Sequence, residues 1–353
     1  SMRKLSILIN SLLVVYVYVA IFGLLHNGMG PGGHIGDEND LALALNMVIP
    51  YAFVSVSLTK SPLRKALFVG VFALMVFGVI ATFSRGGFLG LLSVLLYISV
   101  LTPRKGLALV LVLFVSLGAW IYTPDKYWTE MGTIMDEADN PELGTGGLRR
   151  QYWEIALRMF YENPIFGVGL ENYNHNIYDY EPDDQMQRVG RSFHGMSAHS
   201  LYFTLLAELG LSGSLIFAAI VWFNTKDTNA IIKAAYSNSE RLKSIRKRET
   251  RPNSWENTTP TAHDALLADL NKARFYAHAM RASLLGYLTS AVFLSVFGYP
   301  HFWLLTAMIV ALKEVTDNLL KSPAKSVGQA ADLGGGILQN TLKLRQSISH
   351  HPL

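Results

Sequence analysis

The feature that most constrains this chain is a series of long apolar stretches. A helix needs about 20 mainly apolar residues to cross the hydrocarbon core of a bilayer. Half of the residues are hydrophobic and only 16% are charged. Because lipid offers the backbone no hydrogen-bond partner, stretches that cross it must be helical. The predicted fold class is therefore all-α, a polytopic transmembrane helical bundle. About eight spans are expected, the fourth and the last being short: Leu5–Leu25, Leu41–Leu58, Ala66–Phe83, Phe88–Leu101, Gly106–Tyr122, Leu201–Phe223, Tyr276–Phe297 and Phe302–Val315.

The placement of basic residues predicts an orientation for this bundle. Cytoplasmic loops of membrane proteins are rich in Lys and Arg. With eight spans and the N-terminus inside, 23 of the 30 Lys and Arg residues fall on one side. We expect that side to be the cytoplasm. In a bacterium this would place the chain in the inner membrane, with its other side facing the periplasm or the exterior.

The spans divide the chain into six segments. Residues 123–198 form a large outer loop, within which apolar spacing predicts an amphipathic helix from Gly147 to Glu162. Residues 224–275 are polar and basic, and a flexible cytoplasmic loop is expected there. The other segments are N-terminal transmembrane helices at 1–122, a transmembrane helix at 199–223, C-terminal transmembrane helices at 276–320 and a cytoplasmic tail at 321–353.

The sequence lacks the motifs of several function classes. It has no cysteine, which excludes disulfides and thiolate metal sites. It has no Walker A loop, no dinucleotide fingerprint and no G-x-S-x-G elbow. Acidic runs at 136–142 and 181–184 could bind a divalent ion, but solvated loop charge is the favoured interpretation. The sequence therefore predicts no metal, no cofactor and no nucleic-acid partner.

Arg85 lies between two apolar runs, in the stretch ATFSRGGFLG. A guanidinium at membrane depth costs several kcal/mol unless it is paired or hydrated. Its planar fork of donors suits phosphate oxygens. Arg85 is therefore a candidate for binding phosphate; the alternative is an arginine in a short turn that only contacts headgroups.

Arg149 and Arg150 open the predicted amphipathic helix of the outer loop. Cations oppose the helix dipole at that end unless an anion binds there too. Helix N-terminal amides together with guanidiniums would form a phosphate site. At least one of the two is expected to bind phosphate; the alternative is that they are solvated.

His199 stands at the mouth of the apolar stretch AHSLYFTLLAELGLSGSLIF. In the first turn of a helix the dipole disfavours imidazolium. A neutral imidazole at an interface could accept a proton from a hydroxyl and serve as a general base. For a lone histidine, however, capping or hydration is the better interpretation. Further along, Gly210 and Gly213 predict a smooth surface against which another helix packs.

Taken together, these residues resemble the O-antigen ligase and O-antigen polymerase superfamily, which includes bacterial O-oligosaccharyltransferases. The ligase motif is a histidine, then Asn, Ser or Gln, nine residues and G-x-x-G; here it reads His199-Ser200, nine residues, and Gly210 to Gly213. FSRGG resembles the family's arginine after a transmembrane helix. An arginine four residues before a tryptophan, followed by P-x-x-G-x-G, corresponds to Arg149, Trp153 and residues 164–169. The stretch is also similar to ligase-like proteins associated with exosortase systems.

The resemblance covers about residues 66–223, and it implies a reaction. A glycan would pass from an undecaprenyl-diphosphate donor to an acceptor hydroxyl on the outer face, with inversion at the anomeric carbon and without a metal. The acceptor would be lipid A core, a protein or another surface molecule, and membrane lipids would surround the site. His199 would be the base, and Arg85 and Arg149 would bind the diphosphate. Arg191 is a third, weaker contact. The family usually has more spans, so a shorter relative is expected.

Two alternatives remain open at this point. A polymerase of the same superfamily would extend the glycan on its carrier. A transporter or flippase for a lipid-linked substrate would explain the arginines without chemistry, but it needs a polar path through the spans. Few polar residues lie within the predicted spans, and for Glu208, an exception, a hydrogen-bonding role is expected. The enzyme hypothesis requires His199, Arg85 and Arg149 to converge on one outward cavity.

Overall fold

The described part of the chain is helical throughout. The computed structural model describes residues 1–101, 145–182, 193–249 and 262–321. No strand longer than one isolated bridge occurs within those ranges, so the all-α prediction is confirmed for them. The helices are α1 (Met2–Leu25), α2 (Glu38–Leu58), α3 (Pro62–Ala81), α4 (Arg85–Leu101), α7 (Thr145–Glu162), α8 (Tyr173–Tyr180), α10 (Leu201–Glu249), α11 (Ala262–Ser290), the short 3-10 helix η1 (Ala291–Phe293) and a last helix over residues 300–321.

Four of these helices are long and apolar enough to cross a membrane: α1, α2, α3 and the first part of α10. The chain is a multi-pass membrane protein. α4 is equally apolar but has only 17 residues. α11 ends at Ser290, before the end of the span predicted there, and the predicted span Gly106–Tyr122 lies outside the described residues. The expected number of about eight spans therefore stays a prediction.

α2 forms the centre of the bundle, surrounded by α1, α3, α4 and α11. Its most apolar window is 78% buried, against 33% for α1 and α3, which expose apolar side chains such as Val14 and Leu63 in the way lipid-facing helices do. Asn46 is one of the polar side chains buried in this core. The Asn46 side-chain amide of α2 donates to the Gly87 carbonyl of α4 at 2.7 Å and to the Ser290 hydroxyl of α11 at 3.4 Å. A buried amide needs such partners, and these bonds fix three helices against one another.

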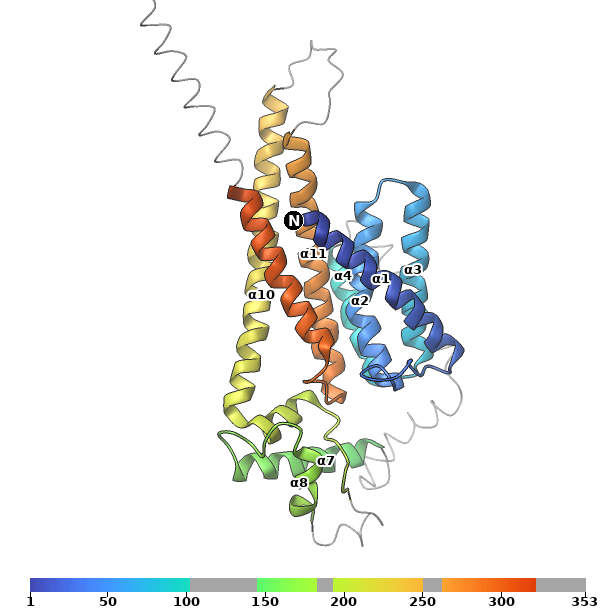
Figure 1. Cartoon of the computed structure of the whole chain (residues 1–353), viewed down its shortest axis with the longest axis vertical. Coiled ribbons are helices and arrows are strands. Elements are labelled where there is room, and N and C mark those ends of the chain that lie inside the picture. Colours follow the sequence, from blue (N-terminus) through green and yellow to red (C-terminus); the bar gives the residue numbers. More distant parts are fainter. Residues whose placement is uncertain (102–144, 183–192, 250–261, 322–353) are drawn as a thin grey trace, which may run out of the picture.

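The prediction of a flexible loop at 224–275 is wrong for the described residues. α10 continues to Glu249 and α11 begins at Ala262, so the two form an antiparallel pair that extends beyond the rest of the bundle (Figure 1). The polar composition conceals a narrow apolar stripe: Ile231 and Ala235 of α10 are buried, one helical turn apart. The charges occupy the solvated faces, where Lys243 pairs with Glu240.

A break in α10 also departs from expectation. Gly210 has φ 60° and ψ −157°, a left-handed backbone that residues with a Cβ rarely adopt. A Cβ on Gly210 would lie 2.6 Å from the carbonyl carbon of Ile165, so the glycine packs against a loop and not against the predicted second helix. For Gly213, a Cβ would meet Leu209 of its own helix.

The loop that fills this break is residues 164–169, which follows α7. Backbone groups freed by the break would otherwise lack partners, and the loop supplies them. Four backbone hydrogen bonds connect the two segments: Val168 N to Ala207 O (2.8 Å), Gly169 N to Glu208 O (2.9 Å), Leu211 N to Pro164 O (2.8 Å) and Ser212 N to Ile165 O (3.1 Å). We call this set the backbone interlock. The interlock joins the P-x-x-G-x-G motif at residues 164–169 to the part of α10 that holds the G-x-x-G motif, residues 210–213. It therefore anchors the end of α7 to α10.

Candidate active site

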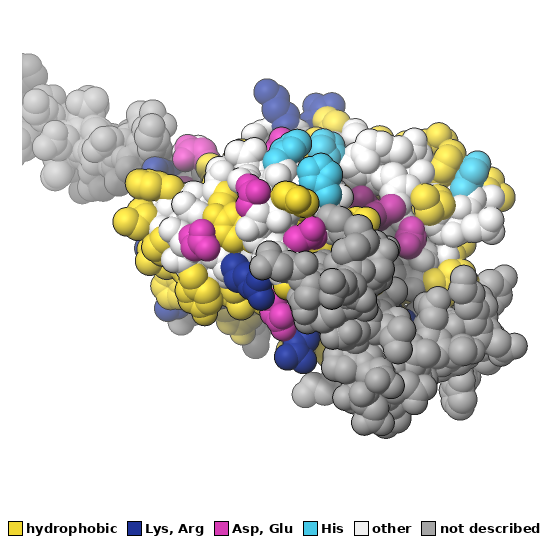
Figure 2. Space-filling view, turned by 90° about the horizontal axis from the view of Figure 1, so that it is seen from below, with side chains coloured by type: hydrophobic (Ala, Val, Ile, Leu, Met, Phe, Trp, Pro, Cys, Tyr) yellow, Lys and Arg dark blue, Asp and Glu magenta, His cyan; other side chains and the backbone are white. Residues whose placement is uncertain are grey.

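The helix ends that carry the candidate residues meet at one end of the bundle. α7 and α8 lie across this end, where α1 and α3 finish and α2, α4 and α10 begin (Figure 1). Seen from this end, acidic and histidine side chains are interspersed on the surface (Figure 2). Arg85, Arg149 and His199 all belong to elements that begin or end here.

Arg85 is the first residue of α4, and its position is fixed by the residue before it. The Ser84 hydroxyl accepts from the Gly87 amide at 3.0 Å, which caps the helix. The same hydroxyl donates to the Asn39 side chain at 2.7 Å, which connects the cap to the start of α2. Arg85 thus stands at a helix N-terminus, where backbone amides and a guanidinium can both face an anion.

Arg149 lies in the first part of α7 and is half-buried. Its guanidinium sits over the Phe293 ring of η1, 5.7 Å from the ring centroid. Gly86, next to Arg85, packs on the same ring. Burial lowers the pKa of the Arg149 guanidinium, and the positive charge of Arg85 lowers it further. Two cations held this close repel each other, so the arrangement favours an anion between them.

The other two arginine candidates do not join this pair. Arg150 is on the surface, where its side chain bonds Glu154 at 3.1 Å with 71% of its own area exposed. Exposed pairs of this type contribute little to stability. Arg191 lies outside the described residues. The structure therefore brings together Arg85 and Arg149 and leaves Arg150 in solvent.

His199 lies just before α10 and not in its first turn as expected. The Ser200 carbonyl accepts from the Thr204 amide at 2.9 Å, so Ser200 is the residue that begins the helix. His199 has φ 47°, in the left-handed region. A histidine costs of order 1 kcal/mol there and needs its surroundings to hold it. Its ring lies 6.1 Å from the Tyr152 ring of α7, centroid to centroid.

The electrostatics around His199 favour the neutral ring. Burial lowers the pKa of His199, the Arg149 charge lowers it further, and the Asp37 carboxylate acts in the opposite direction. A histidine whose pKa lies below its ordinary value is uncharged at neutral pH and can accept a proton. The same interactions show that His199, Arg149 and Asp37 are electrostatic neighbours. Together with the Arg149–Arg85 pair, they form one cluster.

Asp37 is the member of this cluster that the sequence analysis missed. Its carboxylate accepts from the Asp40 amide at 2.7 Å and so caps α2. The only signal available was an acidic residue in the short outer connection between the first two spans. Nothing in the spacing relates that connection to a histidine more than 160 residues away, because only the fold brings them together.

Trp153 links the helix that carries Arg149 to the segment that carries His199. Residues four apart share one face of a helix, so Trp153 and Arg149 both face the start of α10. The Trp153 indole donates to the Ala198 carbonyl at 3.0 Å and stacks on Phe203, with 4.8 Å between ring centroids. The helix that presents Arg149 therefore also holds the residue next to His199.

Glu208 has the hydrogen-bonding role that its sequence position suggested. Its carboxylate accepts from the Glu171 amide at 3.0 Å and from the Tyr173 amide at 3.1 Å. These bonds fix the loop between the interlock and α8. Within the described ranges, no three His, Asp or Glu side chains are grouped so that they could hold a metal ion.

Comparison with known proteins identifies the family. Residues 70–218 match the family model described as O-antigen ligase. This match supports membership of the chain in the O-antigen ligase superfamily. The matched region of this O-antigen ligase homologue contains Arg85, Arg149, His199 and both halves of the backbone interlock. No curated protein matches the chain. Membership supports a glycosyltransferase-type enzyme of polysaccharide biosynthesis that uses a lipid-linked glycan donor and an acceptor in the membrane.

Proposed function

We propose that this protein transfers a glycan from undecaprenyl diphosphate to an acceptor hydroxyl on the periplasmic face of the bacterial inner membrane. The observation that carries the proposal is the placement of His199 near Arg149 and of Arg149 near Arg85: Trp153 of the Arg149 helix bonds the residue before His199, and Arg149 and Gly86 meet at the Phe293 ring. Family membership supplies the reaction class. The sidedness rests on the positive-inside distribution of Lys and Arg.

In the proposed reaction, neutral His199 accepts the proton of the acceptor hydroxyl. The oxygen attacks the anomeric carbon, and the bond from that carbon to the diphosphate oxygen breaks. Attack opposite the leaving group inverts the anomeric centre. Negative charge then grows on the diphosphate, where Arg85, Arg149 and the amides at the start of α4 would stabilise it.

Asp37 has a place in this scheme. After proton transfer His199 carries a positive charge close to Arg149, which is unfavourable. The Asp37 carboxylate, whose charge acts in the direction opposite to Arg149, would partly offset that repulsion. The scheme assigns these roles to side chains and uses neither a metal nor a cofactor.

The test is transfer in lipid nanodiscs from undecaprenyl-diphosphate glycan to candidate acceptors, comparing wild type with His199→Ala. Release of undecaprenyl diphosphate by wild type and its loss in the variant would support the proposal. Product attached to lipid A core or a protein identifies a ligase, and a lengthened glycan on the carrier identifies a polymerase. Movement of the donor across the bilayer without bond cleavage would identify a transporter and contradict the proposal.

A further inference from the structure

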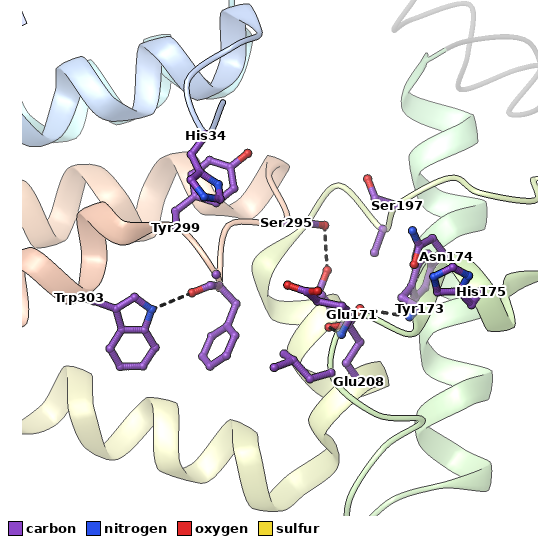
Figure 3. A pocket seen from close by; sticks show the side chains of 15 residues that line it. His34, Glu171, Tyr173, Asn174, His175, Ser197, Glu208, Ser295, Tyr299 and Trp303 are labelled. Carbon is purple, nitrogen blue, oxygen red and sulfur yellow. Dashed lines mark hydrogen bonds between the residues drawn. The ribbon is translucent and has the colours of Figure 1, made fainter. Parts of the chain in front are cut away.

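A cavity of about 580 Å³ lies beside the His199 cluster. It is bounded by the loop before α8, the first turns of α10, the segment after η1 and the connection between α1 and α2 (Figure 3). Its volume is in the range of small-molecule sites. The described residues that line it are His34, Leu170, Glu171, Tyr173, Asn174, His175, Ser197, Ala198, Thr204, Glu208, Ser295, Phe297, Gly298, Tyr299 and Trp303.

Hydrogen bonds fix the walls of this cavity. Glu208 holds the backbone of the loop before α8 through its two amide bonds. The Thr204 hydroxyl of the same helix shares a hydrogen bond of 2.8 Å with the Ser295 hydroxyl, which connects α10 to the segment after η1 (Figure 3). The Tyr299 ring lies 5.3 Å from the His34 ring, and Asp40 of α2 is an electrostatic neighbour of Tyr299. The cavity is therefore largely preformed.

The cavity lies next to the proposed base, although His199 itself is not among its described lining residues. Ser197 and Ala198, the two residues before His199, line it. Arg85 and Arg149 are not among its described lining residues. A ligand held there would approach His199 from a different direction than a diphosphate bound between the arginines. This is the arrangement that an acceptor and a donor require.

The charge of the lining selects the type of ligand. Glu171 and Glu208 contribute carboxylates, whereas the described lining residues include no Lys or Arg. Asp40 lies behind Tyr299 and adds to the negative character. A phosphate or carboxylate would meet like charge in this cavity, while hydroxyl and ammonium groups would find acceptors.

Trp303 and Tyr299 contribute aromatic rings at one end of the cavity (Figure 3). Trp303 is 41% exposed, and its indole donates to the Phe297 carbonyl at 3.2 Å, which fixes the ring plane (Figure 3). Asn174 and His175 lie at the opposite end (Figure 3). A flat ring that can stack, together with amide and carboxylate groups that bond hydroxyls, suits a ligand with one apolar face and many hydroxyl groups.

We infer that this cavity is the acceptor subsite and that it binds a sugar residue that is uncharged or carries an amine, not an anionic one. The inference rests on the proposed function, since it names the acceptor class for the same His199. A peptide acceptor is the competing class. The combination of an exposed tryptophan with an acidic, hydroxyl-bonding lining favours the sugar.

The test uses full-length protein in nanodiscs and an octyl glucoside that carries a photo-crosslinking diazirine. Crosslinks are expected in residues 170–175 and 295–303. Octyl glucoside and octyl glucosaminide should compete for labelling about tenfold better than octyl glucuronide. Trp303→Ala should reduce labelling about tenfold, because it removes the exposed ring. Trp222→Ala is the matched control, since Trp222 is an exposed tryptophan of α10 outside the cavity, and it should label like wild type.

Each alternative result overturns the inference. Stronger competition by the glucuronide, no labelling of these segments, or stronger competition by a serine-containing peptide would do so. The outcome for the proposed function is separate. If transfer proceeds but Trp303→Ala leaves the acceptor KM unchanged, the inference alone fails. If labelling maps to the cavity but wild type cleaves no donor, the proposed function alone fails. His199→Ala should label normally in either case.

Discussion

The two sides of His199 differ in charge and in construction. On one side, Arg149 lies over the Phe293 ring on which Gly86, the neighbour of Arg85, packs, and both arginines stand near helix N-termini. On the other side, the cavity is lined by carboxylates, aromatic rings and an amide. A donor that leaves as a diphosphate needs the first environment, and an acceptor hydroxyl needs the second. The difference shows how one histidine could serve two substrates without attracting the anionic one to the wrong side.

The largest expected effect is at the residue that the two sides share. His199→Ala should reduce the rate of transfer about 10³-fold, because general base catalysis contributes roughly 10²- to 10⁴-fold. Binding of undecaprenyl-diphosphate donor should persist, since the arginines are unchanged. Steady-state release of undecaprenyl diphosphate measures the first quantity, and filter binding of the radiolabelled donor measures the second. Turnover at the wild-type rate would remove His199 from the mechanism.

The next effect tests the cationic side. Arg149→Ala should lower kcat by about 10²-fold, the usual cost of losing one preorganised donor to a developing anion. Arg150→Ala is the matched control from the same helix, because Arg150 is exposed and pairs only with Glu154 among described residues. Its kcat should change less than about twofold. Equal losses in the two variants would mean that the helix, and not the cluster, is being damaged.

A third prediction concerns the interlock that fixes the two sides relative to each other. Gly210→Ala should destabilise the fold by about 2 kcal/mol or more, since a Cβ would be strained at φ 60° and would overlap the Ile165 backbone. Gly70→Ala in α3 is the control, because a Cβ there meets nothing within 4 Å; it should be neutral or slightly stabilising. Thermal unfolding in detergent compares them. A tolerated Gly210→Ala would contradict the left-handed break.

The smallest expected effect concerns the pH dependence of kcat/KM, which reports the pKa of His199. The pKa of His199 is lowered by burial and Arg149, so kcat/KM should fall only when the pH drops below about 6.5, the ordinary histidine value. Asp37→Asn removes the charge that acts in the opposite direction and should move this acid limb to lower pH. Asparagine can still cap α2, which keeps the helix intact. An acid limb that moves to higher pH in Asp37→Asn would contradict the prediction that the Asp37 charge raises the pKa of His199.

The apolar spans and the amphipathic helix were predictable because their signals are local. The expected helix at 147–162 is found as α7 over 145–162, and the first four spans agree with α1 to α4 within a few residues. The α10–α11 extension was not predictable from composition, since its apolar stripe is narrow and its charges resemble those of a loop. The same limit applies to the site: Arg85, Arg149 and His199 are visible as unusual residues in the sequence, whereas Asp37 and the cavity depend on distant segments that only folding brings together.

The interlock between residues 164–169 and 207–212 has a consequence for how such chains can diverge. Its four bonds run from main chain to main chain, so the side chains at the variable positions of both motifs take no part in them. Gly167 and Gly210 are different, because each lies against the backbone of the other segment. Most positions of the two motifs should therefore accept different side chains. At Gly167 and Gly210, a substitution should be tolerated only when the other segment changes as well. A homologue that replaces one glycine is expected to remodel the partner segment as well, and this covariation can be sought in sequences too distant to align elsewhere.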